Sequence, residues 1–305
     1  MFTFLRYGVF PITFFGALAL ASHLHGEGAS AFEAAYTPIG IAITVLIVVE
    51  LCMPLSRDWN RPRGDIVTDI LHMGLTQVAV GRWVKGALTA VIAGGAVSAS
   101  MAVPWWGWLD DVPVLLQVFG AMALTDLPRY WLHRWSHEHP LLWRFHAVHH
   151  SPDRLYWLNA GRFHPVEKAV HTSVSLLVLV GLGLTPEVIV LHAVYSNIHG
   201  MFQHCNIDLR LGPLNWVFPM AELHRWHHAR DLKEANANYG HNVAWWDMLF
   251  GTRQLHASPP APDAVGVEDC PVPASYWGQL LIPFTWNARR ARPALPQRRS
   301  RSRRL

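Results

Sequence analysis

Eight histidines of this 305-residue chain fall into three groups whose spacing places the imidazoles of each group on one side of a helix. One group has the pattern H-x3-H and two have the pattern H-x2-H-H. The groups are His133 and His137; His146, His149 and His150; and His224, His227 and His228. Residues three and four apart share a helix face, so three such helices can direct their imidazoles to one point.

Neutral imidazole is the commonest protein ligand for metal ions and suits zinc, copper, iron and nickel. A four-coordinate ion needs only three or four protein ligands, so eight clustered histidines predict two metal ions. The alternative is a set of buried histidines satisfied by ordinary hydrogen bonds. That alternative is the better explanation of a single histidine, but it accounts poorly for three groups of this kind.

The composition indicates a membrane protein. Hydrophobic residues make up 51% of the chain and charged residues only 15%, against about 25% in soluble domains. The three cysteines, Cys52, Cys205 and Cys270, are far apart and show no C-x-x-C spacing. They therefore predict neither a disulfide framework nor a thiolate metal site.

Several apolar stretches have about the length that a membrane-crossing helix needs. The predicted crossings are residues 8–24, 37–54, 86–103 and 113–132, with a shorter apolar hairpin of 168–185 and 186–204. The letters A-L-A-S near the end of the first stretch resemble a signal-peptide cleavage site, but the further stretches favour a retained helix. The basic loop with Arg57, Arg61 and Arg63 is predicted to be cytoplasmic, which places all three histidine groups on the cytoplasmic face.

The last 17 residues contain eight arginines and no acid. The net charge of the whole chain is +4, so the rest of the chain has a net charge of +4 − 8 = −4. Such a tail is predicted to be disordered. Because the tail accompanies apolar segments, it is expected to bind anionic lipid rather than nucleic acid. The alternative is a solvated tail with no partner. The predicted divisions are a transmembrane region at 1–112, a catalytic domain at 113–256 and a C-terminal segment with this tail at 257–305.

Two further sets of polar residues accompany the apolar stretches. Asp126 lies two helical turns before His133, where it either orients a ligand histidine or forms a salt bridge with Arg129 or Arg134. Within residues 65–81, Asp65, Asp69 and His72 form one polar face of an interfacial or tilted helix. For His72 a surface or packing role is favoured over contact with the site.

The chain resembles the fatty acid hydroxylase / sterol desaturase superfamily of integral-membrane di-iron oxygenases over roughly residues 126–252. The matching segments are D-L-P-R-Y-W-L-H-R-W-S-H, F-H-A-V-H-H-S, R-F-H-P-V-E, F-Q-H-C-N, L-H-R-W-H-H and N-Y-G-H-N-V-A-W-W-D-M-L-F-G-T. The resemblance implies an all-α integral membrane protein with a cytoplasmic helical cap, in which the eight histidines ligate two irons.

The resemblance also suggests further site residues. His204 is similar to an extra family ligand between the second and third groups. His164, in the H-P-x-E pattern of the sterol desaturase branch, is a ligand or a neighbour of one. Glu138 resembles the alkylglycerol monooxygenase branch, while Asp126, Asn242 and Asp247 are candidate partners of the ligands. Other histidines are expected to have packing or surface roles: His139, His171, His192, His199 and His241.

The resemblance implies that O2 and two external electrons convert a C–H bond of a lipid to an alcohol, or two neighbouring C–H bonds to an alkene. Candidate lipids are a sterol, a fatty acyl chain, an ether lipid or a carotenoid. The sequence contains no G-x-G-x-x-G motif or cytochrome-like segment, so a separate protein is expected to donate the electrons. The basic tail, or Arg134, Arg144 and Arg225, could dock an acidic donor. The alternatives are a membrane metal transporter and a non-catalytic relative.

Overall fold

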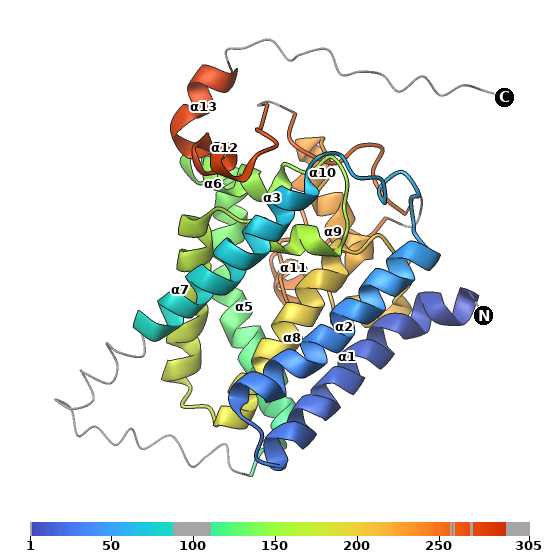
Figure 1. Ribbon diagram of the computed structural model, residues 1–305, viewed down its shortest axis with the longest axis vertical. Coiled ribbons are helices and arrows are strands. Elements are labelled where there is room, and N and C mark those ends of the chain that lie inside the picture. Colours follow the sequence, from blue (N-terminus) through green and yellow to red (C-terminus); the bar gives the residue numbers. More distant parts are fainter. Residues whose placement is uncertain (1, 88–110, 257, 259, 269–270, 291–305) are drawn as a thin grey trace.

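The computed structural model describes residues 2–87, 111–256, 258, 260–268 and 271–290 (Figure 1). These residues form helices and loops with two isolated β-bridges, and no strand occurs among them. The predicted all-helical class is therefore confirmed. The predicted crossing at 86–103 lies outside the described residues beyond position 87, as does the arginine-rich end from 291 onwards.

The first two helices are α1 (Phe2–Gly26) and α2 (Ala31–Cys52). Ser30 caps α2 by accepting a hydrogen bond from the Glu33 N–H, and the Glu33 carboxylate bonds back to the Ser30 N–H. Both helices are long and apolar enough to cross a membrane. Large apolar side chains point outward, including Ile12, Ile41 and Leu51. This outward apolar surface indicates a membrane protein.

Three more long helices complete the bundle: α5 (Val114–Glu138), α7 (Pro165–Gly181) and α8 (Pro186–His204). Thr185 caps α8 and proline follows at the first helical position, so the short turn after α7 reverses the chain into α8. Helix α8 packs against α1, α2 and α5, and α5 also packs against α7 (Figure 1). The last turns of α5 and α8 carry predicted ligands to the same end of the bundle.

A smaller helical segment, α3 (Ile66–Leu71) continuing into η1 (His72–Val80), packs beside α7. Its predicted polar face is buried inside the protein. Arg154 contacts the Asp65 carboxylate at 2.8 and 2.9 Å, and Arg162 pairs with Asp69. Local spacing does not reveal these ion pairs, because both arginines come from a loop about 90 residues later. His72 has the packing role, with its ring held by Phe163 and Gln279.

Short helices lie over the end of the bundle that carries the histidines (Figure 1). They are α6 (Pro140–His150), η2 (Trp157–Gly161), η3 (Gly212–Trp216), α9 (Ala221–His227), α10 (Leu232–Ala235), α11 (Trp245–Leu249), α12 (Tyr276–Leu280) and α13 (Ile282–Arg290). The two H-x2-H-H patterns lie on α6 and at the end of α9. The fold thus brings α5, α6, α8 and α9 together through their histidines.

Candidate metal centre

Nine histidines converge in two adjacent groups. Within each group the ring nitrogens that face one another lie within 4.8 Å. Group 1 consists of His133, His137, His146, His150 and His227; group 2 consists of His149, His204, His224 and His228. The eight histidines of the H-x3-H and H-x2-H-H patterns and His204 all belong to these two groups. The structure therefore brings together every residue of the main predicted ligand set.

Each H-x2-H-H pattern is divided between the two groups. On α6, His146 and His150 enter group 1 while His149 enters group 2. On α9 the division is reversed, because His224 and His228 enter group 2 while His227 enters group 1. Residues four apart differ by about 40° around a helix, whereas neighbours differ by about 100°. The spacing therefore serves two centres rather than one.

The Nε2 atoms face inward and the Nδ1 atoms face outward. In group 2, Nδ1 of His149 donates to the Arg162 carbonyl at 3.0 Å and Nδ1 of His204 donates to the Gly200 carbonyl at 2.8 Å. Each Nε2 then carries a lone pair, yet these two Nε2 atoms lie 3.3 Å apart. Two lone pairs at that distance repel unless a cation lies between them.

Group 1 contains an equivalent pair. Nε2 of His133 lies 3.0 Å from Nε2 of His146, while their Nδ1 atoms contact the Tyr239 carbonyl and the Glu167 carboxylate. Ligand atoms about 2.1 Å from one ion are separated by roughly 3.0–3.4 Å, which matches these contacts. Nε2 of His137 and of His227 has no hydrogen-bond partner among the described residues. The donor set therefore fits two metal ions of the kind that imidazole binds.

Burial keeps these imidazoles neutral. It holds the pKa of His149, His224 and His228 well below the usual 6.5, and nearby histidines lower it further. Neutral imidazole has the free lone pair that a metal requires. The electrostatic environment of the groups is thus suited to ligation.

The segment between α10 and α11 supplies hydrogen-bond acceptors for three histidines of group 1. The Tyr239 carbonyl accepts from His133 and the Ala237 carbonyl accepts from His227, both at 2.8 Å. The Asn236 side chain contacts Nδ1 of His137 at 3.2 Å. We call residues 236–243 the closing segment. Sequence inspection missed this role because two of the acceptors are backbone carbonyls, which any residue could provide.

Two of the predicted carboxylates hold the closing segment rather than a ligand. Asp247 accepts the N–H groups of Tyr239 at 2.8 Å and Gly240 at 2.6 Å. Asp126 accepts backbone N–H groups from residues 241–243 at 3.1–3.2 Å. The expectation that Asp126 contacts a histidine ring or forms a salt bridge was therefore wrong. Three consecutive N–H groups replace both alternatives, and sequence spacing could not have indicated them.

Glu167 is a site residue that sequence inspection overlooked. It is buried, and its Oε1 lies 2.5 Å from Nδ1 of His146. A carboxylate in this position fixes the tautomer and the orientation of the ligand imidazole. Glu167 is the glutamate of the H-P-x-E pattern, of which the sequence analysis considered only the histidine, His164.

The remaining predicted residues lie away from both groups. Both ring nitrogens of His164 contact the backbone, through the Val166 N–H and the Leu280 carbonyl. Glu138 is half exposed and pairs with Arg134 at 2.8 Å. The Asn242 side chain donates to Asp126. None of the three contacts a histidine of group 1 or group 2 in the described structure.

Comparison with known proteins supports the same conclusion. The chain is 34% identical over 253 residues to the ornithine lipid hydroxylase OlsE of Rhizobium tropici, an alignment that covers 81% of this chain and 75% of that protein. The chain belongs to the fatty acid hydroxylase / sterol desaturase superfamily. The fatty acid hydroxylase family model matches residues 118–252, which include all nine histidines. No solved structure matches the chain.

More distant members of the superfamily match a shorter region. Human alkylglycerol monooxygenase is 28% identical over 153 residues, covering 49% of this chain and 32% of that enzyme. Rat methylsterol monooxygenase 1 is 29% identical over 148 residues, covering 47% of this chain and 48% of that enzyme. The names of all three relatives describe hydroxylases or monooxygenases of lipids. These names describe oxidoreductases, and the superfamily is known for iron-dependent hydroxylation.

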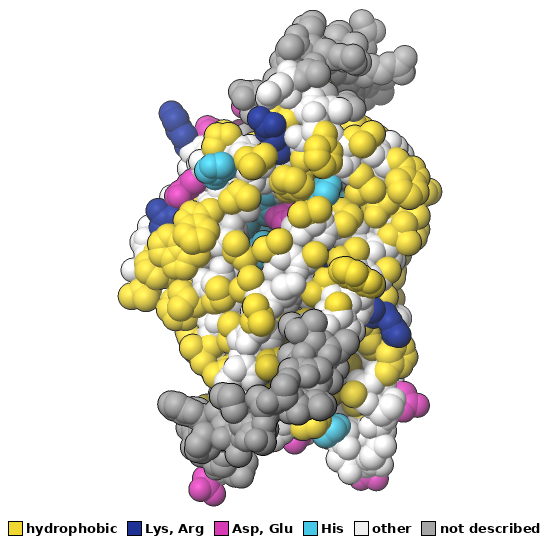
Figure 2. Space-filling model, turned by 90° about the vertical axis from the view of Figure 1, so that its left-hand side faces the viewer, with side chains coloured by type: hydrophobic (Ala, Val, Ile, Leu, Met, Phe, Trp, Pro, Cys, Tyr) yellow, Lys and Arg dark blue, Asp and Glu magenta, His cyan; other side chains and the backbone are white. Residues whose placement is uncertain are grey.

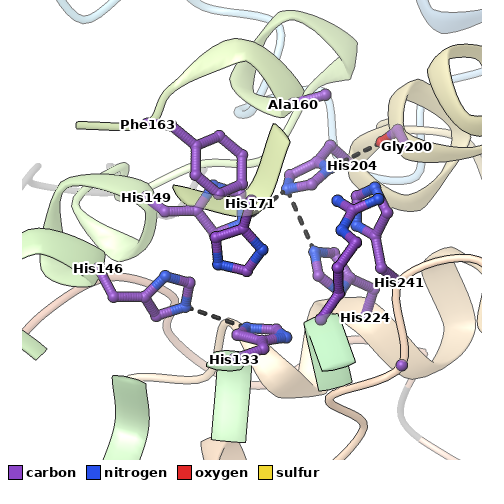
Figure 3. A pocket seen from close by; sticks show the side chains of 12 residues that line it. His133, His146, His149, Ala160, Phe163, His171, Gly200, His204, His224 and His241 are labelled. Carbon is purple, nitrogen blue, oxygen red and sulfur yellow. Dashed lines mark hydrogen bonds between the residues drawn. The ribbon is translucent and has the colours of Figure 1, made fainter. Parts of the chain in front are cut away.

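A cavity of about 30 Å³ lies beside the two groups. Histidines of both groups surround it: His133, His146, His149, His204 and His224 (Figure 3). Arg129, Phe163, His171 and His241 line other parts. The space exceeds the roughly 10–15 Å³ that one water molecule needs, so a small reactant can lie next to both groups.

Proposed function

We propose that this chain is a membrane-bound di-iron oxygenase that uses O2 and two external electrons to hydroxylate a C–H bond of a membrane lipid. The observation that carries the proposal is the close approach of two Nε2 atoms in each histidine group, because a cation between them would relieve the repulsion of their lone pairs. The names of the superfamily members support lipid hydroxylation as the reaction. They favour hydroxylation over desaturation.

The residues have distinct roles in this proposal. Group 1 and group 2 would each hold one iron. The two bound irons would together activate O2. Glu167 and the closing segment orient the ligand rings of group 1. Phe163, stacked on His149 with ring centres 4.3 Å apart, helps to exclude water. Residues 113–256 form the catalytic domain, its histidine groups lie on the cytoplasmic face of the membrane, and a separate protein delivers the electrons.

The access route in the proposal runs from the bilayer. Figure 2 shows a hollow on the face that carries α7 and η1, with histidine side chains visible inside a largely hydrophobic rim. Exposed apolar side chains on these helices include Val166, Val170 and Leu177 on α7 and Leu75 and Val78 on η1. An acyl chain can lie against such a surface while the reacting carbon approaches the histidines.

The first experiment is metal analysis of the full chain purified in detergent after iron supplementation. We expect about two irons in the wild type and fewer in His227→Ala and His149→Ala, which remove one ligand from group 1 and group 2 respectively. The protein is then assayed with ornithine lipid, 18O2 and a reductant. Incorporation of one 18O atom into the lipid supports the proposal. Zinc alone, or a folded two-iron protein that consumes no O2 with any donor or lipid, contradicts it and favours transport or a non-catalytic relative.

A further inference from the structure

The lining of the cavity beside the histidine groups also includes residues of different chemistry. Arg129, His171 and His241 are among the lining residues, and no acidic side chain is one of them. Arg129 lies on α5 one turn before His133, so the guanidinium and a group 1 ligand project from the same helix face. A permanent positive charge therefore lies next to the candidate metal centre.

This charge is not neutralised by an ion pair. Among the described residues Arg129 makes no salt bridge, and its buried Nε has no hydrogen-bond partner. Asp126 lies three residues earlier, but its two oxygens accept hydrogen bonds from the closing segment. Oε1 of Glu167 contacts Nδ1 of His146 and also lies 4.0 Å from Nε2 of His171. Asp126 therefore acts on Arg129 only through space.

Other titratable groups that interact electrostatically with Arg129 include Lys168, His171 and His241, and none of these three supplies a negative charge. Arg129 is partly buried and its Nε has no hydrogen-bond partner among the described residues, so an anion from the ligand can complete the site. The cavity is small, and a guanidinium pairs with a planar carboxylate through two parallel hydrogen bonds. These features favour a carboxylate over the bulkier phosphodiester.

We propose that Arg129, assisted by His171 and His241, binds a carboxylate in the head group of the lipid substrate. The inference rests on the proposed function for the identity of the ligand as a substrate. Because Arg129 is only about one helical turn from His133, about 6 Å along the helix, the carboxylate holds nearby carbons against the metal centre. The oxidised carbon therefore lies in or close to the head group and not far along an acyl chain.

The test measures binding to the full-length, iron-loaded protein in a nonionic detergent by isothermal titration calorimetry. The probes are N-palmitoylglycine, its methyl ester and N-acetylglycine. The variants are Arg129→Gln, Arg129→Lys and the matched control Arg134→Gln, which lies on the same helix but pairs with Glu138 away from the cavity. Iron content and the thermal unfolding midpoint establish that each variant is folded and loaded.

We expect wild type and Arg134→Gln to bind N-palmitoylglycine at least about tenfold more tightly than the methyl ester. Arg129→Gln should lose this preference while binding the ester unchanged, and Arg129→Lys should restore part of it. Weak binding of N-acetylglycine shows that the carboxylate belongs to a lipid and not to a small free acid. Equal binding of acid and ester by wild type, or an unchanged preference in Arg129→Gln, overturns the proposal.

The inference and the proposed function fail in different ways. Carboxylate preference that depends on Arg129, in a protein that transfers no oxygen to lipid, retains the subsite and rejects the oxygenase. Oxygen transfer to lipids with no effect of Arg129 on carboxylate binding retains the oxygenase and rejects the subsite. If Arg129→Gln does not fold, Arg129→Lys and wild type still decide the question through the ratio of acid to ester binding.

Discussion

The two histidine groups differ in how firmly the protein holds their ligands. In group 1, four of the five outward Nδ1 atoms have an acceptor: those of His133, His137, His146 and His227. In group 2, two of four have one, while Nδ1 of His224 and of His228 has no partner among the described residues. Outer contacts of this kind commonly change metal affinity by about 10–100-fold. Group 1 is therefore the preorganised centre and group 2 the more adaptable one.

The largest expected effect comes from the closing segment, which serves group 1 only. A Cβ at position 240 would lie 2.5 Å from the Val243 carbonyl oxygen and 2.6 Å from Asp247 Oδ2. Gly240→Ala must therefore displace the segment, and we expect a loss of about 3 kcal/mol in the free energy of unfolding together with the group 1 metal. Chemical denaturation and metal analysis test this. Gly120→Ala, where the added Cβ meets nothing within 4 Å, is the control. Full retention of two metals by Gly240→Ala would contradict the proposed difference between group 1 and group 2.

The next effect isolates one outer contact. Glu167→Gln keeps the side-chain volume but replaces the carboxyl group beside His146 with an amide. We expect the group 1 metal to bind about 10–100-fold more weakly while group 2 is unaffected. Competition with a chelator of known affinity measures this. Glu187→Gln, in the first turn of α8, should change neither affinity.

A pH dependence shows what the groups share. Because burial lowers the pKa of His149, His224 and His228 from 6.5, the unfolded chain binds protons that the folded chain does not. The stability of the metal-free protein should therefore fall as pH drops below about 6.5, by up to roughly 1.4 kcal/mol per pH unit for each such histidine. Denaturant titrations between pH 5 and 7.5 test the slope. His228→Asn should reduce it, and a slope unchanged by this variant would contradict the assignment.

The smallest effect is kinetic. A chelator should remove the group 2 metal several-fold faster than the group 1 metal, since fewer outer contacts restrain its ligands. Stopped samples analysed for metal should pass through a form with one metal. His228→Ala should keep mainly the slow phase and His146→Ala mainly the fast phase. A single phase in the wild type would mean that the outer contacts do not distinguish the groups.

Sequence reasoning was most successful where the information was local. Helical spacing of like residues predicted that the histidines on α6 and α9 converge, and the family pattern added His204. Sequence reasoning was least successful where contacts joined distant segments. The ion pair of Asp69 was not predicted, because its partner Arg162 lies 93 positions away. Asp126 was misassigned because its partners are backbone N–H groups, which carry no residue identity.

The positions of these histidines along the chain also determine which of the two groups can assemble first during synthesis. Four of the five group 1 histidines lie between positions 133 and 150, so they leave the ribosome together and need only α5 and α6 to meet. From that stretch group 2 receives His149 alone, and it must wait for His204 and for α9. Contacts between nearby residues form sooner than contacts between distant ones. A nascent chain can therefore assemble most of its first centre well before the second centre has its ligands.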